Sequence, residues 1–332
     1  MRALTALVLA TALVATACST SGDDGTLTVY SGRSEELVQP LIDAFEEETG
    51  IDVTVRYAGS ADLAATILEE GDTSPADVFL AQDPASLGTV SLAGLFSTLD
   101  DEVLDTVPSR FSASDGTWVG ISGRARVVVY DASRIDASQF PESEDGFTDS
   151  GWAGRVGIAP TNGSFLSFVA AKILSDGEAA TLEWLEGMKA NGMPTYPNNS
   201  GIVNAVNAGE VEVGLVNHYY LLRALAENPD LPAQNHFFQV ATAGSLVMPS
   251  GAGILASSPN RSAAQEFIAF LLSETAQEYF ATETFEYPLL PGVEANSVLP
   301  PIESIPTPDI DLSLLATELD TATDLVSRAG LL

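Results

Sequence analysis

Basic side chains are scarce in this chain. Lysine and arginine together number 13 against 46 aspartates and glutamates, so the formal net charge is −33. Only two of the 332 residues are lysines, Lys172 and Lys189. A nucleic-acid-binding surface needs cationic side chains to neutralise phosphates, and attraction to anionic lipid needs them too. The composition therefore excludes nucleic acid as a partner and excludes charge-driven binding of the folded body to a membrane.

The residues that commonly build enzyme sites are also few. The chain has two histidines, His218 and His236, and one cysteine, Cys18, which cannot form an ordinary zinc site. It has no Gly-x-Ser-x-Gly nucleophile motif and no phosphate-binding glycine loop. Acidic pairs are abundant, but in so acidic a chain most of them are solvated surface. We expect a protein that is not an enzyme.

The hydrophobic content indicates a folded protein. Hydrophobic residues make up 45% of the chain, too many for an acidic disordered sequence. The negative charge must therefore lie on the surface, where high ionic strength would screen its self-repulsion.

The N-terminus predicts export. Met1-Arg2 precedes an apolar run from Ala3 to Ala17, and Cys18 follows directly. This arrangement is similar to the lipobox of bacterial lipoproteins; the alternative is a plain signal peptide with an incidental cysteine. We expect residues 1–17 to be a signal peptide and 18–26 a lipidated cysteine with a flexible tether. The protein would then be anchored to the outer face of the cytoplasmic membrane, through the lipid only.

Hydrophobic periodicity predicts an α/β protein with two lobes. Strands at 27–30, 51–57 and 76–80 alternate with helices at 34–49, from 60, and at 85–92, a pattern typical of a parallel sheet flanked by helices. Two strands, 118–121 and 126–130, then follow one another and open a second α/β set, where a chain can cross between lobes. Return strands are expected at 236–241 and 245–247, and a final helix at 312–328. The expected division is an N-lobe from 27–122 plus about 242–290, a C-lobe from 123–241, and a C-terminal wrap from 291–332, with a ligand cleft between the lobes.

The best candidates for a site follow the predicted strands, because open sheets bind ligands at the C-terminal ends of their strands. Tyr219 and Tyr220 lie where a strand at 211–216 gives way to a helix. They could be one core and one surface tyrosine, or phenolate ligands of a hard metal such as Fe(III).

Several segments resemble one family, the ferric-ion-binding proteins of bacterial ABC importers, which are class II periplasmic binding proteins. The segments that carry the resemblance are 27–36, 45–53, 69–72, 74–79, 122–130, 217–220 and 285–289. The resemblance implies a two-lobed fold with a mainly parallel sheet in each lobe. It also implies Fe(III) bound by Tyr219 and Tyr220, no catalysis, and delivery to an ABC permease and its ATPase by a monomer.

The resemblance extends unevenly to other site residues. Ser34 stands where the family has a histidine ligand, and Gln82 where it has a glutamate. The segment Asn162-Gly163-Ser164 opens a helix, as does the family loop that holds a carbonate or phosphate beside the iron. Further residues implied by the resemblance are Asn199 and Asn217 at the anion, Arg124 as a neutralising cation, and Arg33 and Tyr57 as possible contacts.

A second hypothesis keeps this fold and changes the ligand. Related class II proteins bind phosphonates, phosphorylated sugars, thiamine or polyamines, and the absence of the histidine and glutamate ligands leaves that alternative open. A secreted hydrolase is a third and weaker alternative.

Overall fold

A computed structural model describes residues 26–332. The predicted signal peptide and Cys18 lie outside the described residues. Within the described part of the chain, no helix has the length and apolar character needed to cross a membrane.

Nine strands of the described chain form one sheet in the order β2-β1-β3-β8-β4-β6-β5, and β7 and β9 pair additionally with β4. The strands are β1 (Thr26–Ser31), β2 (Asp52–Tyr57), β3 (Val78–Ala81), β4 (Val119–Asp131), β5 (Val156–Gly157), β6 (Val213–Asn217), β7 (Ala233–His236), β8 (Val247–Ile254) and β9 (Tyr287–Pro288). The return strands are therefore β7 and β8, each shifted from the position that the sequence predicted.

The sheet is mixed. Strand β1 is parallel to β2 and β3, and β5 is parallel to β6, whereas β8 is antiparallel to β3 and β4. Strands β6 and β7 are also antiparallel to β4. The expectation of a mainly parallel sheet holds for β2-β1-β3 and is wrong for the C-lobe. In that lobe β4 is antiparallel to both β6 and β7, and the parallel pair is β5 with β6.

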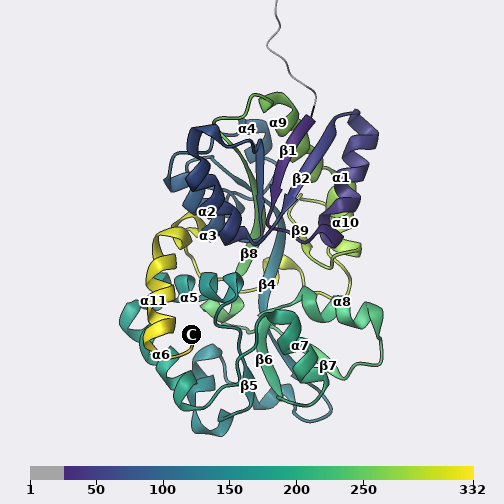
Figure 1. Ribbon diagram of the computed structural model, residues 1–332. Helices are drawn as coiled ribbons and strands as arrows, with labels where there is room; N and C mark the ends of the chain where they lie inside the picture. Colours follow the sequence, from purple (N-terminus) through teal and green to yellow (C-terminus); the bar gives the residue numbers. More distant parts are fainter. Residues whose placement is uncertain (1–25) are drawn as a thin grey trace, which may run out of the picture.

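Helices cover both ends of this sheet, as Figure 1 shows. Helices α1, α2, α3, α4, α9 and α10 surround its upper part, and α5 to α8 surround its lower part. The helices are α1 (Glu35–Thr49), α2 (Ser60–Glu70), α3 (Pro84–Leu92), α4 (Asp101–Leu104), α5 (Gly163–Asp176), α6 (Glu178–Ala190), α7 (Asn199–Asn207), α8 (Tyr219–Glu227), α9 (Arg261–Leu271), α10 (Glu274–Thr282) and α11 (Leu319–Arg328).

Strand β4 connects the two parts of the molecule. The sequence predicted two strands separated at Ser122, but the structure has one strand of 13 residues, all buried, with a register shift between Gly120 and Ser122. Its first half pairs with β8, and its second half pairs with β6 from Arg126 onward. The predicted separation is the segment Ser122-Gly123-Arg124. The flanking pairs with β8 and β9 instead hold this segment extended.

The C-terminal segment touches both parts. The predicted helix over 312–328 is in fact a 3₁₀ turn, η8 (Leu312–Glu318), followed by α11. The 3₁₀ turn packs against α3 and α5, and α11 packs against α5 and α6. The packing on α3 is close, since a Cβ placed on Gly88 would lie 2.7 Å from the Ala316 Cβ.

A separate hydrophobic cluster fixes the end of β6. It contains Val127 and Val129 of β4, Ile202 of α7, Val216 of β6 and Leu221 of α8, all buried. Each such side chain contributes about 1.5–3 kcal/mol when fully buried. The cluster therefore holds the junction between β6 and α8, where the two tyrosines lie, on a rigid base.

Candidate functional site

The two adjacent tyrosines lie at the junction of β6 and α8. Strand β6 ends at Asn217, and α8 begins at Tyr219. Successive residues of a strand point to opposite faces, but the helical turn here brings both rings together. Their centroids are 4.2 Å apart and the rings are stacked with an interplanar angle of 29°. Tyr219 is 1% exposed and Tyr220 is half-buried.

His218 anchors the backbone that carries Tyr219. Its Nδ1 accepts a hydrogen bond of 3.0 Å from the Ala125 N–H, so its Nε2 carries the proton and donates to the Phe285 carbonyl at 2.7 Å. Burial lowers the pKa of His218 to about 4. The imidazole is therefore neutral at ordinary pH and ties α8 to β4 and to the segment before β9.

That segment adopts a strained conformation. Phe285 has φ of 58°, a left-handed conformation that costs a residue with a side chain about 1–3 kcal/mol. The strain aims the Phe285 carbonyl at His218 and places Glu286 beside Arg33. The Arg33 guanidinium donates to both Glu286 carboxylate oxygens, at 2.9 and 2.6 Å, and both side chains are buried.

Three buried arginines act on the tyrosine pair through their charge. Burial raises the pKa of Tyr219 well above its usual value, and Tyr220 raises it further, whereas the charges of Arg33 and Arg124 lower it. Arg126 lies on the same face of β4 as Arg124, two residues along. Burial lowers the pKa of Arg126 to about 10, which leaves it cationic, and nearby Tyr220 acts in the opposite direction.

The guanidinium groups of Arg33 and Arg124 have N–H donors that no hydrogen bond within the described chain uses. Arg126 donates to the Asn217 Oδ1 at 3.4 Å and lies 5.2 Å from the Phe168 ring centroid. The Arg124 guanidinium makes one hydrogen bond to the described residues, donating to the Pro249 carbonyl. Four buried donors on Arg33, Arg124 and Asn217 have no hydrogen-bond partner among the described residues: Arg33 Nε, Arg124 Nε and Nη1, and Asn217 Nδ2. Buried donors are normally paired, so this concentration indicates an anionic ligand.

The predicted anion loop is a connected cluster. The Asn162 side chain caps α5 by accepting from the Ser164 N–H at 3.1 Å and from the Ser164 Oγ at 2.6 Å. Asn199 donates from its Nδ2 to the same Asn162 oxygen and to the Ser164 Oγ. Hydrogen bonds therefore bring together three of the predicted anion residues, Asn162, Ser164 and Asn199. Gly163 lies between the first two in sequence, whereas Asn217 is bonded to Arg126.

The predicted N-lobe contacts share one cavity. Arg33, Ser34, Tyr57 and Gln82 lie at the C-terminal ends of β1, β2 and β3 and line a space of about 360 Å³. Tyr57 donates from its hydroxyl to the Gln39 Oε1 at 2.7 Å.

The Gln82 backbone in this cavity is held firmly. The Gln82 N–H donates to the Ser60 Oγ at 2.9 Å, and Ser60 packs tightly on Gly32, where an added Cβ would lie 2.0 Å from that oxygen. Asp83, next to Gln82, caps α3 and accepts from the Ser86 N–H and Oγ. Across the boundary between the two parts, Ser167 Oγ of α5 also donates to Asp83 at 3.4 Å.

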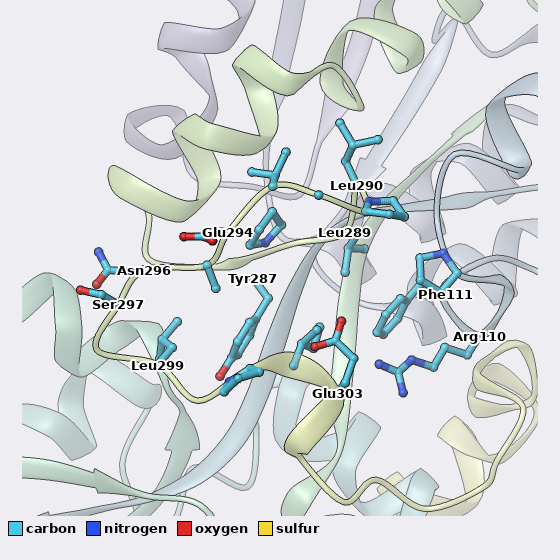
Figure 2. A pocket seen from close by; sticks show the side chains of 18 of the residues that line it. Arg110, Phe111, Tyr287, Leu289, Leu290, Glu294, Asn296, Ser297, Leu299 and Glu303 are labelled. Carbon is cyan, nitrogen blue, oxygen red and sulfur yellow. The ribbon is translucent and has the colours of Figure 1, made fainter.

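A larger cavity, of about 720 Å³, lies elsewhere. It is formed by Pro108, η2 (Ser109–Phe111) and the segment 287–303, and its walls are mostly apolar, with Leu289 and Phe111 among the lining side chains (Figure 2). The Tyr287 hydroxyl in this cavity already donates to the Pro300 carbonyl. The cavity has no pair of phenols and no cluster of unpaired donors, so its size does not make it the ligand site.

Sequence reasoning missed three residues of this site. Arg126 lies two residues after Arg124 in β4 and therefore on the same face, so the alternation of side chains along a strand could have predicted it. Glu286 pairs with Arg33 across 253 positions of sequence, and only the fold shows that contact. His218 was considered only as a possible zinc ligand. Within the described residues, no group of three or more histidines, cysteines or acids could hold a metal ion.

Comparison with known proteins places the chain in a class. Residues 73–310 match the model of the bacterial extracellular solute-binding protein family, and the chain belongs to that family. Its fold, a mixed α/β sheet in two lobes, is that of the periplasmic binding proteins.

Individual relatives and solved structures similar to the chain have names that specify the ligand. The chain is 34% identical to the Fe(3+)-binding periplasmic protein of Serratia marcescens, over 98% of this chain and 97% of that protein. The structure of iron-bound HitA from Pseudomonas aeruginosa superposes with a TM-score of 0.87 at 36% identity, over 92% of this chain and 99% of that one. A Trichodesmium protein in complex with iron and citrate ligands superposes with a TM-score of 0.81 at 28% identity, over the same shares. These names describe binding proteins, in agreement with the expectation that the chain is not an enzyme.

Proposed function

We propose that this protein captures Fe(III) outside the cytoplasm and delivers it to an ABC permease with its ATPase. Tyr219 and Tyr220 are the protein ligands in this proposal. Carbonate or phosphate binds beside the iron, at Asn162, Gly163 and Ser164 with Asn199 and Asn217. The observation that carries the proposal is the stacked phenol pair beside buried guanidiniums with unpaired donors. The iron-binding relatives support it.

The chemistry of these residues suits a trivalent ion. A free phenol has a pKa of about 10, and a bound cation stabilises its anionic form. Burial raises the pKa of Tyr219, so the empty site holds a neutral phenol. Iron then replaces the proton, and Arg33 and Arg124 stabilise the resulting phenolate. Such a site releases protons as it binds and weakens in acid.

We infer that the ligand lies between an N-lobe (27–122 plus about 242–290) and a C-lobe (123–241), with 291–332 as a wrap. Strands β4 and β8 would serve as the hinge, because they run through both parts of the sheet. Two contacts support closure: Ser167 with Asp83, and Arg223 of α8 with Glu36 of α1 at 2.8 Å. Closure should reduce the radius of gyration when iron binds, and identical scattering curves at proven occupancy would contradict it.

The lipid anchor at Cys18 and a monomeric state belong to the same proposal. The acidic surface gives the folded body no other reason to remain on a membrane.

Iron titration tests the function. Chelator-treated protein is titrated with Fe(III) in carbonate or phosphate buffer, and the visible charge-transfer band is followed for the wild type and for Tyr220→Phe. The wild type should gain colour at one iron per chain and lose it to a strong chelator, and the variant should lose both colour and tight binding. Equal, colourless binding by both proteins would make the tyrosines structural and favour the organic-ligand hypothesis.

A further inference from the structure

The C-terminal end of the chain spans both lobes. We call the 3₁₀ turn η8 (Leu312–Glu318) together with α11 (Leu319–Arg328) the C-terminal strap. Its first part packs against α3 of the N-lobe and α5 of the C-lobe, and its second part packs against α5 and α6 (Figure 1). The strap therefore joins the lobes at a place separate from the strands β4 and β8.

The second part of the strap is attached to the C-lobe. Leu325 and Val326 of α11 are fully buried. The Lys189 Nζ, near the end of α6, donates to the Gly330 carbonyl just beyond α11 at 2.5 Å. Burial of its apolar face is what mainly stabilises a helix on a protein surface. Since η8 is continuous with α11 and also packs on α5, we expect the whole strap to move with the C-lobe.

The contact of the strap with the N-lobe depends on close approach. A Cβ placed on Gly88 of α3 would lie 2.7 Å from the Ala316 Cβ and 3.2 Å from the Ser313 carbonyl oxygen of η8. The Ser114 N–H of the N-lobe donates to the Ser313 Oγ at 3.2 Å. Contacts of this kind lose much of their attraction when the surfaces separate by even a fraction of an ångström. The contact is therefore sensitive to the position of one lobe relative to the other.

The conformation of η8 is one that its own sequence does not favour. Its leucines, alanine and glutamate favour an α-helix continuous with α11, yet the seven residues form a 3₁₀ helix. Long 3₁₀ runs are uncommon because their hydrogen bonds are poorer, and they often mark a hinge or a strained segment. Packing on α3 and α5 therefore holds η8 in this form, and η8 has little local stability to lose when it detaches.

The two helices that the strap bridges both begin at the proposed site. Helix α3 begins at Pro84, directly after Gln82 and Asp83, and α5 begins at Gly163 of the anion loop. The Asp83 carboxylate accepts a hydrogen bond of 3.4 Å from the Ser167 Oγ of α5, so the two helices also meet beside the site. A movement of α3 relative to α5 therefore changes the site and the strap together.

Resting on the proposed function, we propose that the C-terminal strap holds the lobes closed around the iron. In the closed protein η8 packs on α3, as it does in this structure. When the lobes open, α11 stays on the C-lobe and η8 separates from α3. The packing of η8 on α3 therefore contributes to the retention of iron, although the strap does not touch the metal.

Hydrogen–deuterium exchange of the full-length protein, followed by mass spectrometry, tests this movement. Chelator-treated protein is compared with protein carrying one Fe(III) per chain in bicarbonate buffer. The amides of 312–318 should exchange several-fold more slowly with iron, because η8 then stays packed on α3. The amides of 319–328 should exchange at the same rate in both states, because α11 remains on the C-lobe.

Gly88→Ala tests the contribution of the strap to iron binding. The added methyl group clashes with Ala316 while η8 lies on α3, and opening relieves the clash. Overpacking of this kind in the closed protein should weaken iron binding by about tenfold. The visible band per bound iron should not change, because the ligands are intact. Gly88→Ala combined with Ala316→Gly removes the clash and should restore most of the affinity.

Two further variants complete the test. Gly151→Ala is the matched control, because an added Cβ there would meet no described atom within 4 Å apart from those of its own 3₁₀ turn, η5 (Ser150–Trp152). It should leave iron affinity unchanged. Ala316→Gly alone serves if Gly88→Ala does not fold: it removes a methyl contact without adding a clash, and should release iron to a chelator faster than the wild type.

The outcomes separate the strap from the proposed function. Iron-loaded wild type with unchanged exchange over 312–318, or with equal slowing over 312–318 and 319–328, would overturn the strap and leave the proposed function standing. Equal iron affinity of Gly88→Ala and Gly151→Ala would also overturn the strap. A wild type that binds no iron would refute both the proposed function and the role of the strap in it.

Discussion

Replacing Tyr219 by phenylalanine removes one ligand oxygen and little else. The ring is 1% exposed and stacked on Tyr220, and both features survive the change. No hydrogen bond joins the Tyr219 hydroxyl to another described residue, so the free energy of unfolding of the iron-free protein should change by less than about 1 kcal/mol. The effect should therefore fall on iron binding and not on folding.

The size of that effect follows from electrostatics. Two unit charges 4 Å apart attract by about 4 kcal/mol at an effective dielectric constant of 20. A phenolate bound to a trivalent ion lies closer and meets more charge, so this value is a lower limit. At about 1.4 kcal/mol per tenfold, Tyr219→Phe should weaken iron binding by about a thousandfold or more.

The pH dependence gives a second, independent readout. Iron must displace the proton of Tyr219, because burial raises the pKa of Tyr219 well above its usual value. The variant has one proton fewer to release, so its affinity should rise less steeply with pH. Competition with a chelator of known affinity measures both quantities. Tyr130→Phe is a matched control, since its hydroxyl donates to Gln234 at the far end of β4. Affinity within threefold of wild type, with the same pH slope, would refute tyrosinate ligation.

Three further predictions concern the support of the site and its anchoring. Glu286→Gln leaves the buried Arg33 without its counter-charge and should lower the free energy of unfolding by about 3–5 kcal/mol in urea titrations; a loss below about 1 kcal/mol would show that the pair is not essential. Burial lowers the pKa of His218 to about 4, so the neutral imidazole contributes about 3 kcal/mol to the free energy of unfolding above pH 6.5, and this contribution is lost as the pH falls toward 4. His218→Gln should therefore lose less stability than the wild type over that pH interval. An equal loss of stability in both proteins would contradict this assignment. Cys18→Ser should move the protein from the membrane to the soluble fraction, and retention of the variant after a salt wash would argue against a lipid anchor.

Much of the fold could be predicted from local sequence patterns. The alternation of strands and helices from 27 to 92 has clear periods of two and 3.6, and the structure reproduces it as β1 to α3. The predictions were wrong where the pairing of strands distant in sequence determines the structure. Strand β4 continues through Ser122-Gly123 because β8 and β9 hold it extended, and no local signal announces those partners.

The residues of the site also separate into those that the sequence predicts and those that only the fold brings together. Residues that follow strands, such as Tyr219, Tyr220 and Gln82, can be found from the strand pattern and from family resemblance. The pairing of Arg33 with Glu286 cannot, because the two residues are 253 positions apart and meet only after the sheet has formed. The neutral state of His218 likewise depends on the Ala125 N–H and the Phe285 carbonyl, which lie on other segments.

The most direct test of the central claim is to locate the metal. Crystals of the iron-loaded protein, measured at the iron absorption edge, should show one anomalous peak bonded to both the Tyr219 and the Tyr220 hydroxyl oxygens, beside the arginine cluster. A peak bonded to neither tyrosine, or an organic molecule without iron in that position, would contradict the account.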